Sequence, residues 1–305
     1  MAWGRSGLMS QMRRLPRVLK RSWRAFERLD PGRLDRILES VGRIEARQLD
    51  DQNPSELADR EFTVYSQNGE DGILHFLTRA VTIPRRVFVE FGVGDYREAN
   101  TRFLAVSSNW AGLVIDSGAE NIRQIRDDPI YWRTNLTAVH AFVTRENINS
   151  LLSKSGITGE IGLLSIDIDG NDYWVFDAIE VVSPAIVVIE YNSRFGPDKA
   201  VTIPYDPSFD RWRAHPSGLY AGASIRAICN LAQRKGYSFV GCNSFGVNAF
   251  FVRNDLMNDR IRVREVEEGF VAGQFREARD SRGRLAYLDR AEEEQILAGM
   301  PLVEV

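Results

Sequence analysis

The sequence predicts an α/β fold in which a doubly wound, seven-stranded sheet ends in a C-terminal antiparallel β-hairpin. From residue 84 onward, apolar runs typical of buried strands alternate with amphipathic, helix-like stretches, a pattern that indicates a parallel sheet with helices on both faces. Near the C-terminal end, the apolar runs 237–242 and 249–252 are joined by residues 243–248 alone. A parallel crossover needs about a dozen residues or more, so this pair must be antiparallel.

Each predicted element follows from a local pattern. Apolar and β-branched residues predict seven strands at 87–91, 112–115, 138–143, 162–166, 185–190, 237–242 and 249–252. Amphipathic spacing predicts helices at 98–106, 120–125, 147–153, 173–179, 224–235 and near 291–297. The helix 224–235 has the clearest limits, because Ser224 is a good N-cap and Gly236 follows two basic residues at its end.

The composition is that of an ordinary globular protein of 305 residues, with 44% hydrophobic and 27% charged residues. The net charge of −3 argues against a nucleic-acid binder that relies on bulk electrostatics. Cys229 and Cys242 have neither metal-ligand nor redox spacing, which favours a reducing, cytoplasmic setting. We expect neither a membrane span nor a secretory signal, because no apolar run is long enough.

Composition and pattern divide the chain into three parts. Residues 1–60 form a basic, helical N-terminal extension, residues 61–254 form the sheet domain, and residues 255–305 form a charged, mostly helical extension. Within residues 1–30, basic side chains are interleaved with apolar ones such as Leu15 and Trp23. One interpretation is an amphipathic helix in peripheral contact with the inner membrane face or with a partner. The other is a surface helix or a tail.

The segment 87–95 carries the main indication of function. Its strand contains Glu90 near its end, and Gly92 and Gly94 follow in a tight turn before the next helix. Glycines allow a ligand to approach the backbone closely, and the carboxyl edge of an open α/β sheet is where nucleotide-like ligands bind. A dinucleotide-binding fingerprint would need a third glycine at position 97, where this chain has Arg97.

The second strand ends in Asp116, about twenty residues after the glycine loop. An acid at this position accepts hydrogen bonds from the hydroxyls of a ribose, a requirement that NAD and S-adenosylmethionine (SAM) share. The alternative is that Asp116 caps the following helix. Phe142, near the end of the third predicted strand, is a candidate for contact with an adenine ring or for core packing.

The acid, the Gly-x-Gly loop and the closing hairpin together resemble class I SAM-dependent methyltransferases, from about residue 63 to residue 253. The resemblance implies a Rossmann-like sheet and SAM as the cofactor. It also implies that Gly92 and Gly94 lie along the methionine and ribose of SAM. Glu90 would then hydrogen-bond the amino group of SAM, directly or through water.

The segment 65–74, Tyr-Ser-Gln-Asn-Gly-Glu-Asp-Gly-Ile-Leu, resembles the FkbM-like branch of these enzymes, which often act on sugars and natural products. The resemblance implies that Gln67 and Asp71 reach the methionine end of the cofactor. The same residues also suit a helix start, where an acid stabilises the positive terminus. The branch usually carries Lys-x-Asp-x-Glu-Gly at the fourth strand, and residues 165–170 replace both the lysine and the glutamate.

Acidic and amide side chains follow two strands of the predicted sheet. Asp167 and Asp169 follow the fourth strand, whereas Glu190 and Asn192 lie at the end of the fifth. Asp167, Glu190 and Asn192 resemble the Mg²⁺ ligands of some metal-dependent O-methyltransferases, although Tyr191 separates the acid from the amide. Oxygen ligands of this kind suit such a cation. Without a metal, Asp167 or Asp169 is the candidate general base.

The connection 192–220 is too long for a simple turn, and loops of this length are usually functional or disordered. It contains aromatic and charged residues suited to binding a polar, ring-shaped substrate such as a sugar. His215 is its only histidine and a candidate base near neutral pH. Upstream of it, Asn171 and Asp172 are interpreted as a turn and the cap of the next helix.

The leading hypothesis is a SAM-dependent O-methyltransferase that acts on a sugar or glycan hydroxyl or on a similar small polar acceptor. Three alternatives remain. Asp167-x-Asp169 is also the pattern of a metal-dependent glycosyltransferase, and the fold can serve as a non-catalytic scaffold. A nicotinamide oxidoreductase is disfavoured by Arg97 and by the hairpin.

Overall fold

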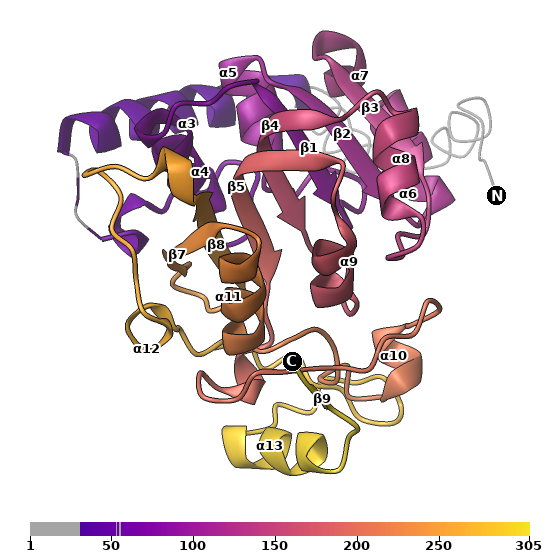
Figure 1. Cartoon of the computed structure of the whole chain (residues 1–305). Coiled ribbons are helices and arrows are strands. Elements are labelled where there is room, and N and C mark those ends of the chain that lie inside the picture. Colours follow the sequence, from indigo (N-terminus) through magenta and orange to yellow (C-terminus); the bar gives the residue numbers. More distant parts are fainter. Residues whose placement is uncertain (1–30, 53, 55) are drawn as a thin grey trace, which may run out of the picture.

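A computed structural model describes residues 31–52, 54 and 56–305. The basic segment 1–30, with its predicted membrane or partner contact, lies outside the described residues. The main sheet has seven strands in the order β3-β2-β1-β4-β5-β8-β7. The prediction of a doubly wound α/β sheet is therefore confirmed (Figure 1).

The strands lie close to their predicted positions. They are β1 (Val87–Phe91), β2 (Ala111–Asp116), β3 (Leu136–His140), β4 (Gly159–Ile166), β5 (Val182–Glu190), β7 (Tyr237–Cys242) and β8 (Asn248–Arg253). The pairs among the first five strands are parallel, whereas β8 pairs antiparallel with both β5 and β7. The short 243–247 connection closes the hairpin, as its length requires.

Helices cover both faces of the sheet (Figure 1). On one face lie α4 (Glu70–Ala80), α5 (Arg102–Ser108), α6 (Ala119–Asp127) and α7 (Pro129–Arg133). On the other lie α8 (Ile148–Lys154), α9 (Asp172–Ala178) and α11 (Ile225–Arg234). A further helix, α3 (Pro31–Gln52), contacts α4 and α5. The two faces bury separate apolar clusters because successive residues of a strand point to opposite sides.

The same alternation sets the direction of the polar residues at the carboxyl edge. Ile166 and Ile189 are neighbours in the sheet, and both point into the cluster under α8, α9 and α11. The next residues, Asp167 and Glu190, should therefore point to the side of α4 and α5. Glu190 pairs with Asn248 of β8, so a third polar side chain joins them on that side. The register thus gathers polar groups from three strands.

Two of the predicted boundaries that differ from the structure affect the site. The helix expected at 98–106 begins only at Arg102, because residues 95–101 form a loop in which Tyr96 has a positive φ of 63°. The strand expected at 138–143 spans Leu136–His140. As a result, Phe142 belongs to the loop that follows β3.

The C-terminal segment packs beneath the sheet (Figure 1). The strand β9 (Val303–Glu304) pairs antiparallel with β6 (Val201–Thr202), and α10 (Arg211–Ala214), α12 (Val266–Gly269) and α13 (Arg290–Ala298) complete this region. A third apolar cluster joins the segment 195–220 to the C-terminal segment through residues such as Ile203 and Leu297. This cluster holds the long connection against the rest of the molecule.

The three-part division of the chain stays a prediction, but the expectation that residues 255–305 are mostly helical is wrong, because most of this segment outside α12 and α13 is irregular. Among the described residues, none of the helices combines the length and apolar character that crossing a membrane requires.

Candidate functional site

A cavity of about 270 Å³ lies at the carboxyl edge of β1, β2 and β4. We call it the Phe142 cavity, and its lining includes Gly92, Gly94, Asp116, Phe142, Asp167, Asp169, Asn171 and Phe209. Five of these residues were predicted site residues from three separate strand ends, and the fold brings them together. Phe142 is 48% exposed, so its ring is available to a ligand and is not part of the packed core.

The two glycines of the loop have different tasks. Both adopt a left-handed conformation, with φ of 74° at Gly92 and 54° at Gly94. A Cβ at Gly92 would lie 1.6 Å from the carbonyl oxygen of Asp167, so this glycine is needed for contact between the two loops. A Cβ at Gly94 would meet no atom within 4 Å. Gly94 is therefore the position where a ligand can lie against the backbone.

Asp116 joins the glycine loop to the loop after β2. Its Oδ1 accepts hydrogen bonds from Gly118 N (2.7 Å) and Asn121 Nδ2 (2.8 Å), and its Oδ2 accepts one from Gly94 N (2.8 Å). A carboxylate has about four acceptor positions, so Oδ2 retains capacity for another donor. The side chain is thus held in place at the cavity wall and can still accept from a ligand hydroxyl.

A smaller cavity of about 80 Å³ adjoins the first, because Gly92 and Asp167 line both. We call it the Glu90 cavity. Its lining contains the carboxylates of Glu70, Glu90, Glu98 and Asp167 but no basic side chain, together with the amides of Gln67, Asn68, Asn100 and Asn248. Such a lining favours a ligand group that is cationic or rich in donors.

Glu90 is buried and already holds the start of α5. Its carboxylate accepts from the backbone N–H groups of Asn100 (2.9 Å) and Thr101 (3.1 Å) and from the Thr101 hydroxyl (2.5 Å). Burial raises the pKa of Glu90 to about 7 despite these hydrogen bonds, which favour the charged form. Glu90 lines the cavity, and it also holds in place the loop that sequence patterns had assigned to a helix.

Gln67 and Asp71 differ in their positions. Gln67 lines the Glu90 cavity and donates to Glu98 (3.0 Å). Asp71 lines neither joined cavity, and one of its oxygens accepts from three successive backbone N–H groups of residues 64–66. Asp71 lies in the first turn of α4, as the helix-start interpretation expects, whereas its contact with a cofactor stays a prediction.

Asp167, Asp169 and Glu190 each bring an oxygen atom within 4.8 Å of the other two. The amide oxygen of Asn192 is engaged elsewhere, since its Oδ1 accepts from Arg194 N (3.2 Å). Its Nδ2 donates to the carbonyls of Leu219 (2.8 Å) and Ala221 (2.9 Å), so it anchors the long connection instead of facing a metal. The three clustered carboxylates thus differ from the predicted ligand set, which has Asn192 in place of Asp169.

Burial and mutual repulsion raise the pKa of Asp167 and Glu190, since each carboxylate faces its acidic neighbours. Arg211 of α10 forms an ion pair with Asp169 at the edge of the cluster and donates to Gly218 O (2.7 Å). The cluster thus combines groups able to hold a proton near neutral pH with one neutralising cation.

His215 follows α10, but it lines neither joined cavity. Its Nδ1 accepts from Ser217 N (3.3 Å) and lies 2.7 Å from the Ser217 hydroxyl. The structure does not bring His215 together with the acidic cluster, so the expectation that it is the base gains no support.

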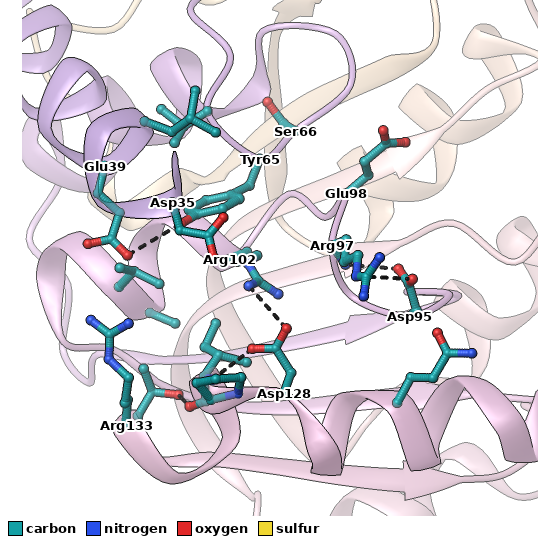
Figure 2. Close-up of a pocket in the computed structure, with 18 of the residues that line it drawn as sticks. Asp35, Glu39, Tyr65, Ser66, Asp95, Arg97, Glu98, Arg102, Asp128 and Arg133 are labelled. Carbon is teal, nitrogen blue, oxygen red and sulfur yellow. Dashed lines mark hydrogen bonds and ion pairs between the residues drawn. The ribbon is translucent and has the colours of Figure 1, made fainter. Parts of the chain in front are cut away.

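A third and larger cavity, of about 920 Å³, lies beyond the loop 95–98 and is lined by α3, α5, α6 and α7 (Figure 2). Its charges are largely paired, as in the Arg102–Asp128 and Arg97–Asp95 contacts. None of the site residues predicted from the sequence lines it, although Glu98 borders both this cavity and the Glu90 cavity.

The residues of the joined cavities that sequence patterns missed include Glu70, Asn171 and Asn248. Asn171 was interpreted as part of a turn and cap, but its side chain caps nothing and instead donates to Asp206 O (2.7 Å). Asn248 gave no local signal. The hairpin prediction could have found it, because an antiparallel partner of strand 185–190 must place a residue beside Glu190.

No protein-family model and no curated protein matches the chain. Solved structures similar to it include a SAM-dependent methyltransferase from Clostridium acetobutylicum (11% identity, 60% of this chain and 90% of that chain covered, TM-score 0.40). They also include an O-methyltransferase from Bacillus cereus (14%, 70% and 88%, 0.39) and M. capricolum TrmK (12%, 75% and 87%, 0.37). Both of the latter were solved with S-adenosylhomocysteine (SAH). Likeness at this level assigns no activity to the chain.

Proposed function

We propose that the protein is a SAM-dependent methyltransferase that transfers a methyl group to a hydroxyl of a sugar, a glycan or a similar small polar acceptor. The observation that carries the proposal is the pair of joined cavities, which place Gly94, Asp116 and Phe142 beside the acidic cluster. One cavity offers the groups that bind an adenosine. The acidic cluster beside it offers carboxylates close to the point where SAM would deliver its methyl group.

The residues of the Phe142 cavity fit the nucleoside half of SAM. The open space over Gly94 admits a ribose against the backbone, and Asp116 has acceptor capacity for its hydroxyls. The exposed ring of Phe142 offers a face on which adenine can stack. When bound, SAM would supply an electrophilic methyl group on its sulfonium.

The acidic cluster fits the task of accepting a proton from the acceptor hydroxyl. Burial and neighbouring acids raise the pKa of Asp167, and a base whose pKa lies near the working pH is efficient at general-base catalysis. Asp167 also touches the glycine loop through its carbonyl, next to Gly92. The base and the cofactor loop are thereby held at a fixed spacing, which favours in-line transfer.

The same three carboxylates also fit a divalent cation such as Mg²⁺, since their oxygens lie within 4.8 Å of one another. A bound cation would lower the pKa of the acceptor hydroxyl. Arg211 competes for Asp169, so metal binding must weaken that ion pair. We expect titration calorimetry with MgCl₂ to show binding that Asp167→Asn abolishes. Asp259→Asn, at an exposed aspartate, should bind as the unaltered protein does.

A metal-dependent glycosyltransferase is not favoured. That hypothesis uses Asp167 and Asp169 but gives no task to the glycine loop or to Asp116, which together form the wall of the Phe142 cavity. A non-catalytic scaffold is opposed by the cluster of Asp167, Asp169 and Glu190, because holding like charges together costs stability and such clusters are concentrated at functional sites.

Calorimetric titration of the full chain with SAH tests the proposal. SAH should bind, and Phe142→Ala should weaken binding about tenfold, since stacking of a base on an aromatic ring contributes about 1–3 kcal/mol. The ring is half exposed, so its removal should leave the thermal midpoint almost unchanged.

Trp132→Ala is the matched control, because Trp132 is 78% exposed on α7 and lines none of the cavities described above. It should bind SAH with the affinity of the unaltered protein. A folded sample that gives no heat with SAH would show that the proposal is wrong, and a titration with UDP- and GDP-sugars plus Mn²⁺ would then test the glycosyltransferase alternative.

A further inference from the structure

Four buried side-chain atoms in the described part of the chain have no hydrogen-bond partner: Asp71 Oδ1, Arg102 Nε, Asn171 Oδ1 and Asn248 Oδ1. The two amide oxygens belong to residues that line the joined cavities, one in each. Asn171 and Asn248 are only 3% and 4% exposed. A buried acceptor without a partner is costly, so such atoms in a cavity wall call for a donor from outside the chain.

The orientation of the Asn171 amide is set by its neighbour. Its Nδ2 donates to the carbonyl oxygen of Asp206 at 2.7 Å, and a carbonyl can only accept. Turning the amide over would set two oxygen acceptors against each other. The Oδ1 of Asn171 is therefore the atom without a partner, and it belongs to a residue that lines the Phe142 cavity.

A carboxylate fixes the Asn248 amide in the same way. Its Nδ2 donates to Glu70 Oε1 at 2.8 Å, and that oxygen also accepts from Asn243 Nδ2 at 2.8 Å. The other oxygen of Glu70 accepts from Asn68 N at 2.8 Å, so Glu70 is held from two sides. Asn248 thus keeps its Oδ1 as an unused acceptor, and the residue lines the Glu90 cavity together with the carboxylates named above.

We propose that Asn171 and Asn248 are specificity-determining residues that bind the two N–H-bearing ends of the cofactor. Asn171 accepts from the exocyclic 6-amino group of adenine, and Asn248 accepts from the α-ammonium of the amino-acid end. This inference rests on the proposed function. It deepens that function, because one ligand can satisfy the Oδ1 atoms of both Asn171 and Asn248 only if it has an N–H donor at each end. SAM and SAH have such donors, the 6-amino group of adenine at one end and the α-ammonium at the other.

The chemistry of the two cavities supports this assignment of ends. The Phe142 cavity contains the aromatic ring and Asp116, which suit the adenosine. The Glu90 cavity has four carboxylates and no basic side chain in its lining, so it favours a cationic ammonium. A neutral hydrogen bond changes affinity by about tenfold at most, whereas one to a charged group changes it by about tenfold to a hundredfold.

Competition between SAH and S-inosylhomocysteine tests the adenine end. The inosine analogue replaces the 6-amino donor by a carbonyl, which would face Asn171 Oδ1 as a second acceptor. The unaltered protein should therefore prefer SAH by about tenfold. Asn171→Ala and Asn171→Ser should bind both ligands with nearly equal affinity.

Removal of the α-amino group from SAH tests the other end. The unaltered protein should bind the analogue that has hydrogen in place of this group about tenfold to a hundredfold more weakly than SAH. Asn248→Ala should lose most of this preference. Asn135→Ala, at an exposed asparagine outside the joined cavities, should retain both preferences.

The readout is a ratio of affinities, so a general loss of stability in a variant does not imitate the expected result. If the unaltered protein binds SAH but does not distinguish it from either analogue, or if both Asn variants keep the full preferences, the inference is wrong while the proposed function stands. If the folded, unaltered protein does not bind SAH at all, both are wrong.

Discussion

At the scale of single residues, the glycine loop shows how one motif serves two physical requirements. Gly92 is needed because the carbonyl of Asp167 occupies the space of a Cβ, whereas Gly94 leaves open space at the cavity wall. The sequence predicted that both glycines admit a ligand. The sequence could not show that the two glycines differ, because the difference depends on the carbonyl of Asp167, more than 70 residues away.

Substitution by alanine should separate the two glycines. Gly92→Ala should be strongly destabilising, since it adds a steric clash to the cost of about 1–2 kcal/mol for a left-handed alanine. Gly94→Ala should destabilise by only about 1–2 kcal/mol, the cost of a left-handed alanine. It should also weaken SAH binding, because the added methyl group narrows the Phe142 cavity. Thermal unfolding and SAH titration measure the two effects.

Gly156→Ala is the control for the backbone cost, because Gly156 has the same φ of 74° and a Cβ added there would meet no atom within 4 Å. It should lower the thermal midpoint slightly and leave SAH binding intact. Equal destabilisation by Gly92→Ala and Gly156→Ala would contradict the contact between Gly92 and Asp167.

At the scale of elements, local sequence patterns predicted the strands and the hairpin, whose formation depends on residues close together in the chain. The strands and the hairpin follow from apolar runs and a short connection, and they were found within a few residues of their predicted positions. The start of α5 was wrong because Glu90 holds the backbone of Asn100 and Thr101 in a loop. The position of Asn192 could not be predicted from its neighbours, because its amide donates to carbonyls 27 and 29 residues away.

The long connection is an element whose position depends on the C-terminal segment. Leu297 of α13 is 5% exposed in the apolar cluster that joins the two. Leu297→Ala should cost about 2–5 kcal/mol locally and should raise the rate of proteolysis within residues 201–220 at least tenfold. Timed digestion with mass spectrometry measures this rate.

Leu285→Ala provides the comparison, because Leu285 is 42% exposed in the same C-terminal segment. It should be cleaved at the rate of the unaltered protein. If Leu297→Ala left the connection equally resistant, the cluster would not be what holds it.

At the scale of the whole molecule, the carboxyl edge of the sheet concentrates buried acids whose stability depends on pH. Burial raises the pKa of Glu90 to about 7 and that of Asp71 to about 6, from ordinary values of 4.5 and 3.8. In the folded state these groups hold protons that the unfolded chain releases. Their contribution is fully present below the unfolded pKa values and is lost as pH rises through the folded ones.

The thermal midpoint should therefore fall as pH rises from about 4.5 to about 7 at constant ionic strength. Glu90→Gln should flatten part of this slope, because it removes one titrating group. Calorimetry across this range, with Asp259→Asn as the unaffected control, measures the slope. A midpoint that rises through the same range would contradict the raised pKa values.

The contact between Gly92 and Asp167 has a consequence for protein engineering. The loop after β1 and the loop after β4 touch through their backbones, so neither can be exchanged alone. A chimaera that takes its cofactor loop from one parent and its acidic cluster from another would have to match two backbone surfaces that leave no room for even a methyl group between them. Both loops must therefore be taken from the same parent.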